Sequence, residues 1–142
     1  MPSLQRKTAA AAAILMVIAF LGGVLLGAAQ TKKIDADVGA VVAAHLNALL
    51  GSLWLGVLAF TLPMLRYGDV GKRRLVLATA LPAYANWLVT TVKAFFHVAG
   101  VEPTGDSAND IVFGTLTALV VIPSFVAAIA WAYGLLGPRD GD

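Results

Sequence analysis

Four long stretches without a charged side chain dominate this sequence. They cover residues 8–31, 38–65, 75–92 and 111–138, and none of them contains Asp, Glu, Lys or Arg. A helix needs about 20 apolar residues to cross roughly 30 Å of hydrocarbon, so each stretch is able to span a membrane. A helix of a water-soluble protein needs a polar face, which these stretches do not provide. The pattern predicts membrane helices at roughly 8–29, 39–65, 74–97 and 111–136.

The segments that connect these stretches are too short to bury a core of their own. We therefore expect a single all-α transmembrane domain over residues 1–142, folded as a four-helix antiparallel bundle. The first stretch is longer than the apolar region of a typical signal peptide, so we expect it to remain as a membrane helix. The absence of cysteine excludes disulfides, thiolate metal sites, iron–sulfur clusters and a cysteine nucleophile.

The basic residues predict the orientation of the bundle. Seven of the ten Lys and Arg residues lie in the two tails and in the connection between the second and third helices. Lys and Arg concentrate on the cytoplasmic side of membrane proteins, so both termini are expected to be cytoplasmic. The sequence pI near 9.2 therefore reflects membrane topology, and no nucleic-acid partner is expected.

The second helix contains polar residues that lipid does not tolerate on an exposed face. These residues are His45, Asn47 and Ser52. An ionisable residue within a membrane helix is a candidate functional residue, although a histidine there can also serve only as an interhelical hydrogen-bond partner. Ser52 lies seven residues after His45 and shares its face, which fits either a flat ligand or a close helix contact. A single imidazole can hold a haem iron from one side and leave the other side open.

The third helix has a polar stripe formed by Asn86, Thr90, Lys93 and His97, at helical spacing. Lys93 and His97 lie near the outer boundary, where polar side chains reach water without a special function. Asn86 is deeper and needs partners inside the bundle.

Tyr84 is equally deep on the third helix and also needs a partner there. Asp110 begins the fourth helix, where we expect it to cap the helix N-terminus.

Several of these residues belong to motifs that resemble the small four-helix membrane isomerases. The likeness covers about residues 40–136 and depends on the order and spacing of short motifs, which are Ala44-His45, Leu62-Pro63, Asp69 and Ala85-Asn86-Trp87. This family comprises the styrene oxide isomerases and the hydroxylaminobenzene mutases. The resemblance implies that His45 is the axial ligand of haem b, at or near the interface between subunits of a homotrimer. It also implies that the ferric iron acts as a Lewis acid.

The chain differs from the styrene oxide isomerases at three positions. Counted without gaps from His45, it has Gly51, Pro82 and Thr90 where that branch has a catalytic Asn, an Asp and a Tyr. The resemblance therefore favours the mutase reaction, which converts a hydroxylaminoarene to an aminophenol.

On this interpretation the catalytic residues that orient the substrate are Asn47, Tyr84 and Asn86, and Ser52 accompanies His45 in cofactor binding. The expected partners are the bilayer, a small apolar aromatic substrate and two further copies of the chain, in a bacterial inner membrane. The alternatives are a haem-binding electron carrier or sensor, whose second axial ligand is His97 or a Met, and a haem-free scaffold protein.

Overall fold

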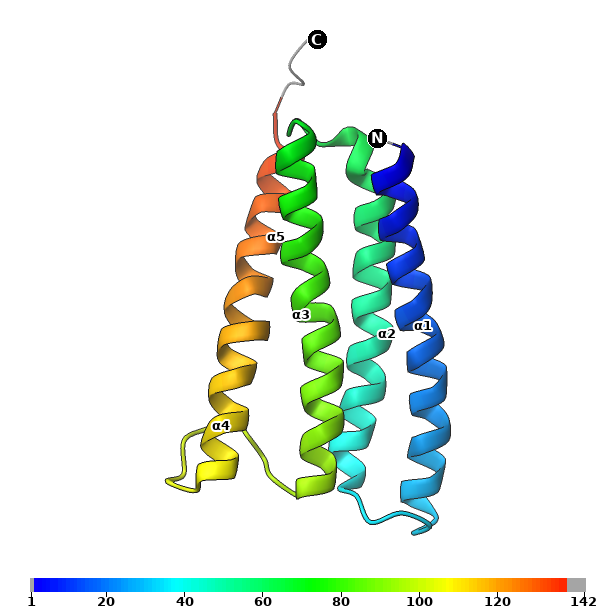
Figure 1. Cartoon of the computed structure of the whole chain (residues 1–142), viewed down its shortest axis with the longest axis vertical. Helices are drawn as coiled ribbons and strands as arrows, with labels where there is room; N and C mark the ends of the chain where they lie inside the picture. The colour runs from blue at the N-terminus through cyan, green and yellow to red at the C-terminus, as the bar shows by residue number, and fades with distance from the viewer. Residues whose placement is uncertain (1, 138–142) are drawn as a thin grey trace.

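The computed structural model describes residues 2–137, which form membrane-length helices joined by short connections (Figure 1). Helix α1 covers Pro2–Gln30 and α2 covers Val38–Thr61, followed by a short 3-10 turn at Leu62–Met64. Helix α3 covers Asp69–Phe96. The last membrane helix is α4 (Ser107–Leu116), a π-helical turn (Thr117–Val121) and α5 (Ile122–Leu135) in continuous succession.

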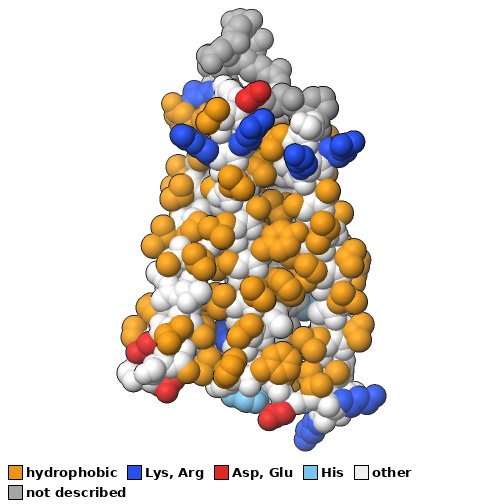
Figure 2. Space-filling view, viewed as in Figure 1, with side chains coloured by type: hydrophobic (Ala, Val, Ile, Leu, Met, Phe, Trp, Pro, Cys, Tyr) orange, Lys and Arg blue, Asp and Glu red, His pale blue; other side chains and the backbone are white. Residues whose placement is uncertain are grey.

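Four helical spans in this part of the chain are long and apolar enough to cross a membrane, and it contains no strand. Large apolar side chains such as Phe20, Phe60 and Phe125 are 65–69% exposed on the outside of the bundle. Figure 2 shows these hydrophobic side chains as a broad belt between two charged ends. Exposed apolar surface on this scale is stable in lipid and costly in water, so the chain is a multi-pass membrane protein.

Most helix boundaries extend beyond the predicted ones. Helix α3 begins at Asp69 rather than 74 and α4 at Ser107 rather than 111. Helical hydrogen bonding continues past the hydrocarbon core, and Lys and Arg near a helix end reach the interface through their long side chains. The absence of charge therefore marks the hydrocarbon-spanning part of a helix and misses its charged first turns.

The prediction that Asp110 caps the fourth helix is wrong, because that helix begins earlier. Asp106 is the cap, and its Oδ2 accepts a hydrogen bond of 2.9 Å from the Asn109 backbone N–H. Asp110 instead fixes the preceding loop, where it accepts from the backbone N–H groups of Thr104 (2.8 Å) and Gly105 (3.1 Å).

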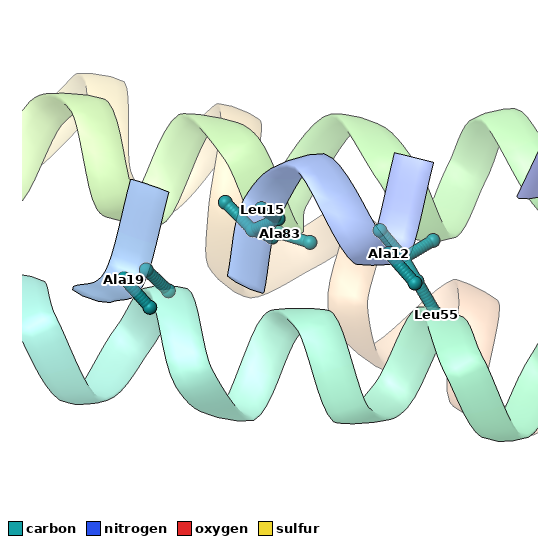
Figure 3. Close-up of a cluster of buried hydrophobic side chains, with 6 residues drawn as sticks. Ala12, Leu15, Ala19, Leu55 and Ala83 are labelled. Atoms are coloured by element: carbon teal, nitrogen blue, oxygen red, sulfur yellow. The ribbon is translucent and has the colours of Figure 1, made fainter. Parts of the chain in front are cut away.

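The interior of the bundle consists of small and medium side chains arranged in three clusters along its length. The central cluster, shared by α1, α2 and α3, is formed by Ala12, Leu15, Ala19, Ala48, Leu55 and Ala83 (Figure 3). A second cluster joins α2, α3 and α5 through Leu58, Leu75 and Ala127. Small residues let helix backbones approach closely in lipid. Helices α2 and α3 contribute to both clusters, so they are the central pair, with α1 and α5 packed on either side.

The two ends of the bundle differ in charge. The basic end carries Lys7, Arg66, Arg73 and Arg74, and the acidic end carries Asp35, Asp37, Glu102, Asp106 and Asp110. The start of α1 and the end of α5 both lie at the basic end (Figure 1). The cytoplasmic location of this end stays a prediction, and Arg139, which contributed to it, lies outside the described residues.

Candidate functional site

His45 lies on the side of α2 that contacts α1. Its Nδ1 is 2.8 Å from the backbone carbonyl oxygen of Ala19 in α1. A carbonyl oxygen only accepts hydrogen bonds, so this contact places the proton on Nδ1 and leaves Nε2 with its lone pair free. Nε2 makes no hydrogen bond to any residue between 2 and 137, and it is not fully enclosed.

Two glycines of α1 leave space beside the imidazole. A Cβ added at Gly22 is 3.7 Å from His45 Nδ1, and one added at Gly23 is 3.5 Å from His45 Cε1. A side chain larger than alanine at Gly23 is therefore expected to extend over the ring. The glycines keep the half-buried imidazole accessible at the α1–α2 surface.

A second polar group joins α2 to α3. Asn47 Nδ2 donates to Asn86 Oδ1 at 3.0 Å and to Thr90 Oγ1 at 3.2 Å, which uses both of its hydrogens. Thr90 Oγ1 donates in turn to Asn86 Oδ1 at 3.4 Å. This arrangement leaves Asn47 Oδ1 as an acceptor and Asn86 Nδ2 as a donor, with no hydrogen-bond partner among the described residues.

The free polar atoms of Asn47 and Asn86 belong to residues that border a cavity of about 260 Å³ between α2, α3 and α5. We call it the amide cavity. Its lining residues are Asn47, Leu50, Gly51, Trp54, Pro82, Ala83, Asn86 and Ser124. An aromatic and several aliphatic side chains with a few convergent polar groups are typical of a site for a small apolar ligand.

Ser124 reaches the amide cavity from the irregular part of the fourth membrane helix. Pro123 has no backbone N–H, and the helix before it widens into the π turn, with the Ile122 N–H bonded to the Thr117 carbonyl. Such a turn shifts the direction of the side chains that follow it. Ser124 was not predicted as a site residue, although a serine beside a proline in an otherwise apolar helix is a recognisable signal.

Gly51 lies on α2 where Leu15 of α1 and Ala83 of α3 pack closely against it. A Cβ added there is 3.1 Å from both Ala83 Cβ and Leu15 Cδ2. These are tight contacts, so a longer side chain at this position needs the helices to move apart. Glycine at position 51 therefore lets the neighbouring helices pack closely against α2. An Asn side chain does not fit there unless the helices move apart.

Two other predicted site residues lie away from the amide cavity. Ser52 is 2% exposed, and its Oγ donates to the Leu49 carbonyl at 2.7 Å and lies 3.7 Å from Met16 Sδ in α1. The Tyr84 hydroxyl donates to the Ala11 carbonyl of α1 at 2.7 Å. The Ser52–Met16 and Tyr84–Ala11 contacts each join two helices of the same chain. The role of Ser52 in cofactor binding and the role of Tyr84 in catalysis stay predictions.

The two polar groups face opposite sides of α2. Two residues correspond to about 200° of rotation around a helix, so His45 faces α1 while Asn47 faces α3. The structure thus brings Asn47 together with Asn86 and separates both from His45 of the same chain.

His97 ends α3 at the acidic end, with a left-handed backbone conformation (φ 53°). Its Nε2 is 3.2 Å from Asp35 Oδ1, and both side chains are exposed. Residues 2–137 contain no group of three or more His, Cys, Asp or Glu side chains that could hold a metal ion. Any metal bound through His45 therefore needs other ligands, such as those of a macrocycle.

The comparison with protein families gives a match over nearly the whole chain. The family model for styrene oxide isomerase matches residues 4–136. No curated protein and no solved structure gives a significant match. Because the match includes all four membrane helices and both polar groups, this chain belongs to the styrene oxide isomerase family.

Proposed function

We propose that this protein is a haem b-dependent membrane isomerase that converts a hydroxylaminoarene to an aminophenol. Membership of the styrene oxide isomerase family supports an intramolecular isomerase in the membrane. The observation that carries the finer assignment is the pair of free polar atoms, Asn47 Oδ1 and Asn86 Nδ2, at an apolar cavity.

The surroundings of His45 fit a histidine that would hold a haem iron. Protein imidazoles that bind metals usually donate their second N–H to a carbonyl or carboxylate, which fixes the tautomer and orients the ring. The Ala19 carbonyl supplies this acceptor, and Gly22 and Gly23 place no side chain against the imidazole. Ferric haem held there would supply a Lewis acid that polarises the bond to oxygen in the substrate.

The amide cavity fits a hydroxylamine better than an epoxide. A hydroxylamino group has N–H and O–H donors as well as an acceptor oxygen, and it satisfies both Asn47 Oδ1 and Asn86 Nδ2. An epoxide oxygen only accepts, so it leaves the Asn47 oxygen unpaired. A polar atom that is desolvated without a partner costs about 1–3 kcal/mol, which favours the hydroxylamine as substrate.

The reaction is balanced without an oxidant or reductant. The N–O bond breaks with its electron pair going to oxygen, and a C–O bond forms at the aromatic ring. The ring C–H proton is lost, and the nitrogen gains a proton to become the amine. Asn47 and Asn86 hold the hydroxylamino group in one orientation, and apolar side chains form much of the cavity wall around it.

His45 and Asn47 face opposite sides of α2, so the two polar groups do not meet within one chain, and a shared site would need a second copy. We propose a homotrimer in which His45 of one subunit serves the amide cavity of the next. Each subunit then contributes one cofactor ligand and one substrate cavity, and the three sites are equivalent.

Epoxide isomerisation remains the second candidate, because the family model carries that name. We expect detergent-purified protein to show a Soret band and to convert hydroxylaminobenzene to an aminophenol faster than it converts styrene oxide to an aldehyde. Absorbance and product analysis with both substrates measure this. Preferential turnover of styrene oxide would contradict the mutase assignment, and a colourless protein would contradict the haem.

Mixed oligomers test whether the site is shared between subunits. His45→Ala and Asn86→Ala chains are each expected to lose about 99% of their activity or more, but co-expression should restore activity in about a quarter of the sites of a randomly mixed trimer. Each restored site combines an intact His45 with an intact cavity from its neighbour. The control mixes two preparations of the His45→Ala chain with different tags. Mixed oligomers without any regained activity would place the whole site within one chain.

A further inference from the structure

A groove of about 430 Å³ opens between α1 and α3 at the basic end of the bundle. Its lining residues are Ser3, Leu4, Lys7, Thr8, Ala11, Arg73, Val76 and Leu77. It has no residue in common with the amide cavity. The groove extends along α1 from Ser3 to Ala11, whose carbonyl accepts the hydrogen bond from the Tyr84 hydroxyl of α3.

The mouth of the groove is positively charged, and residues 2–137 provide no counter-ion inside it. Lys7 comes from α1 and Arg73 from α3, and no Asp or Glu lines the groove. Neither cation forms an ion pair with a carboxylate of residues 2–137. The first turn of α1 adds backbone N–H groups that have no acceptor within the helix. Two cations that line the same groove favour the binding of an anion there.

The walls below these cations are apolar and face the hydrocarbon. Leu4, Ala11 and Val76 form them, and Leu77 is 69% exposed at the edge. The hydroxyl of Thr8, the polar side chain among them, is already satisfied by the Leu4 carbonyl at 2.9 Å. These wall residues leave no side-chain polar group without a hydrogen bond, so this part of the groove suits an alkyl chain.

We propose that this groove binds an anionic phospholipid, with its phosphate between Lys7 and Arg73 and an acyl chain along Ala11 and Leu77. Figure 2 shows Lys and Arg side chains gathered along this end of the molecule, above the apolar belt. Basic pockets between membrane helices are a known way of recognising such headgroups. A zwitterionic lipid is a poorer ligand, because the groove has no carboxylate to balance its ammonium group.

The test is a titration of the full-length protein in detergent with phosphatidylglycerol, with the bound lipid counted by native mass spectrometry. We expect one lipid to bind more tightly than the rest and more tightly than phosphatidylcholine. The double variant Lys7→Gln/Arg73→Gln should weaken this binding roughly 10- to 30-fold, because two surface cations are lost. Ala11→Leu narrows the apolar part of the groove without changing its charge, and it should also weaken the binding of phosphatidylglycerol.

The matched control is Lys32→Gln/Lys33→Gln at the acidic end. Those two lysines border a cleft of the same volume, about 430 Å³, which also contains Asp35. The control removes the same charge and should leave phosphatidylglycerol binding unchanged. Circular dichroism and gel filtration verify that each variant is folded. Unchanged lipid binding in the Lys7/Arg73 variant would overturn the proposal. Equally tight binding of inorganic phosphate would also overturn it, because the site would then recognise a free anion.

Discussion

Replacement of His45 by alanine is expected to abolish haem binding and reduce turnover by about 10³-fold or more, which is the largest effect predicted for any single side chain. The loss of a Lewis acid removes several kcal/mol of transition-state stabilisation. The chain has no cysteine thiolate, and its second imidazole, His97, faces Asp35 at the acidic end. The Soret absorbance and the rate with hydroxylaminobenzene measure the two losses, and added imidazole should partly restore the spectrum.

Two pairs of variants distinguish the loss of the proposed haem ligand from a general loss of folding. His97→Ala should keep both haem and activity, because that side chain is exposed at the end of α3. Gly23→Leu should reduce haem binding with His45 intact, since its side chain extends over the imidazole. Gly27→Leu is its control, because an added Cβ at Gly27 meets nothing within 4 Å. A His45→Ala protein that retains haem and activity, with the losses at His97→Ala instead, would contradict the assignment.

The four membrane spans were predictable because hydrocarbon excludes charge, and the uncharged stretches therefore mark them directly. The charged first turns of α3 and α4 were not predictable in this way. Lys72 and Arg73 interrupt the apolar pattern but continue the helix, so Asp69 rather than residue 74 begins α3. The choice of Asp110 as a cap failed for the same reason, because a cap can be identified only once the helix start is known.

The sequence predicted which residues form the site better than it predicted how these residues contact one another. Intramembrane polarity identified His45, Asn47 and Asn86, because each needs a partner in lipid. It did not indicate which partner each one finds. The Ala19 carbonyl has no sequence signal, since every residue carries the same backbone acceptor. That Tyr84 bonds α1 rather than lining the amide cavity depends on how the helices are rotated, which a short polar stripe does not determine.

The second large effect is expected at the amide pair. Asn47→Ala and Asn86→Ala should each lower turnover of hydroxylaminobenzene by about 10²-fold, which is typical for the loss of a group that orients the reacting atoms. The Soret band should remain, because neither side chain is the proposed iron ligand and neither bonds His45 of its own chain. Thr91→Ala is the neighbouring control, since its hydroxyl bonds only the Trp87 carbonyl of its own helix at 2.8 Å.

The hydrogen bond of 3.0 Å between Asn47 and Asn86 makes a further distinction possible. Each carboxamide holds the other in place, so removal of either one also frees its partner. The double variant should therefore lose little more than either single variant, about 10² rather than 10⁴-fold, because residues that act as a unit are not additive. Steady-state rates of the four proteins, compared at equal haem content, give the coupling. Fully additive losses would mean that the two amides act on the substrate independently. Unchanged rates would mean that the amide cavity is not the site of the reaction.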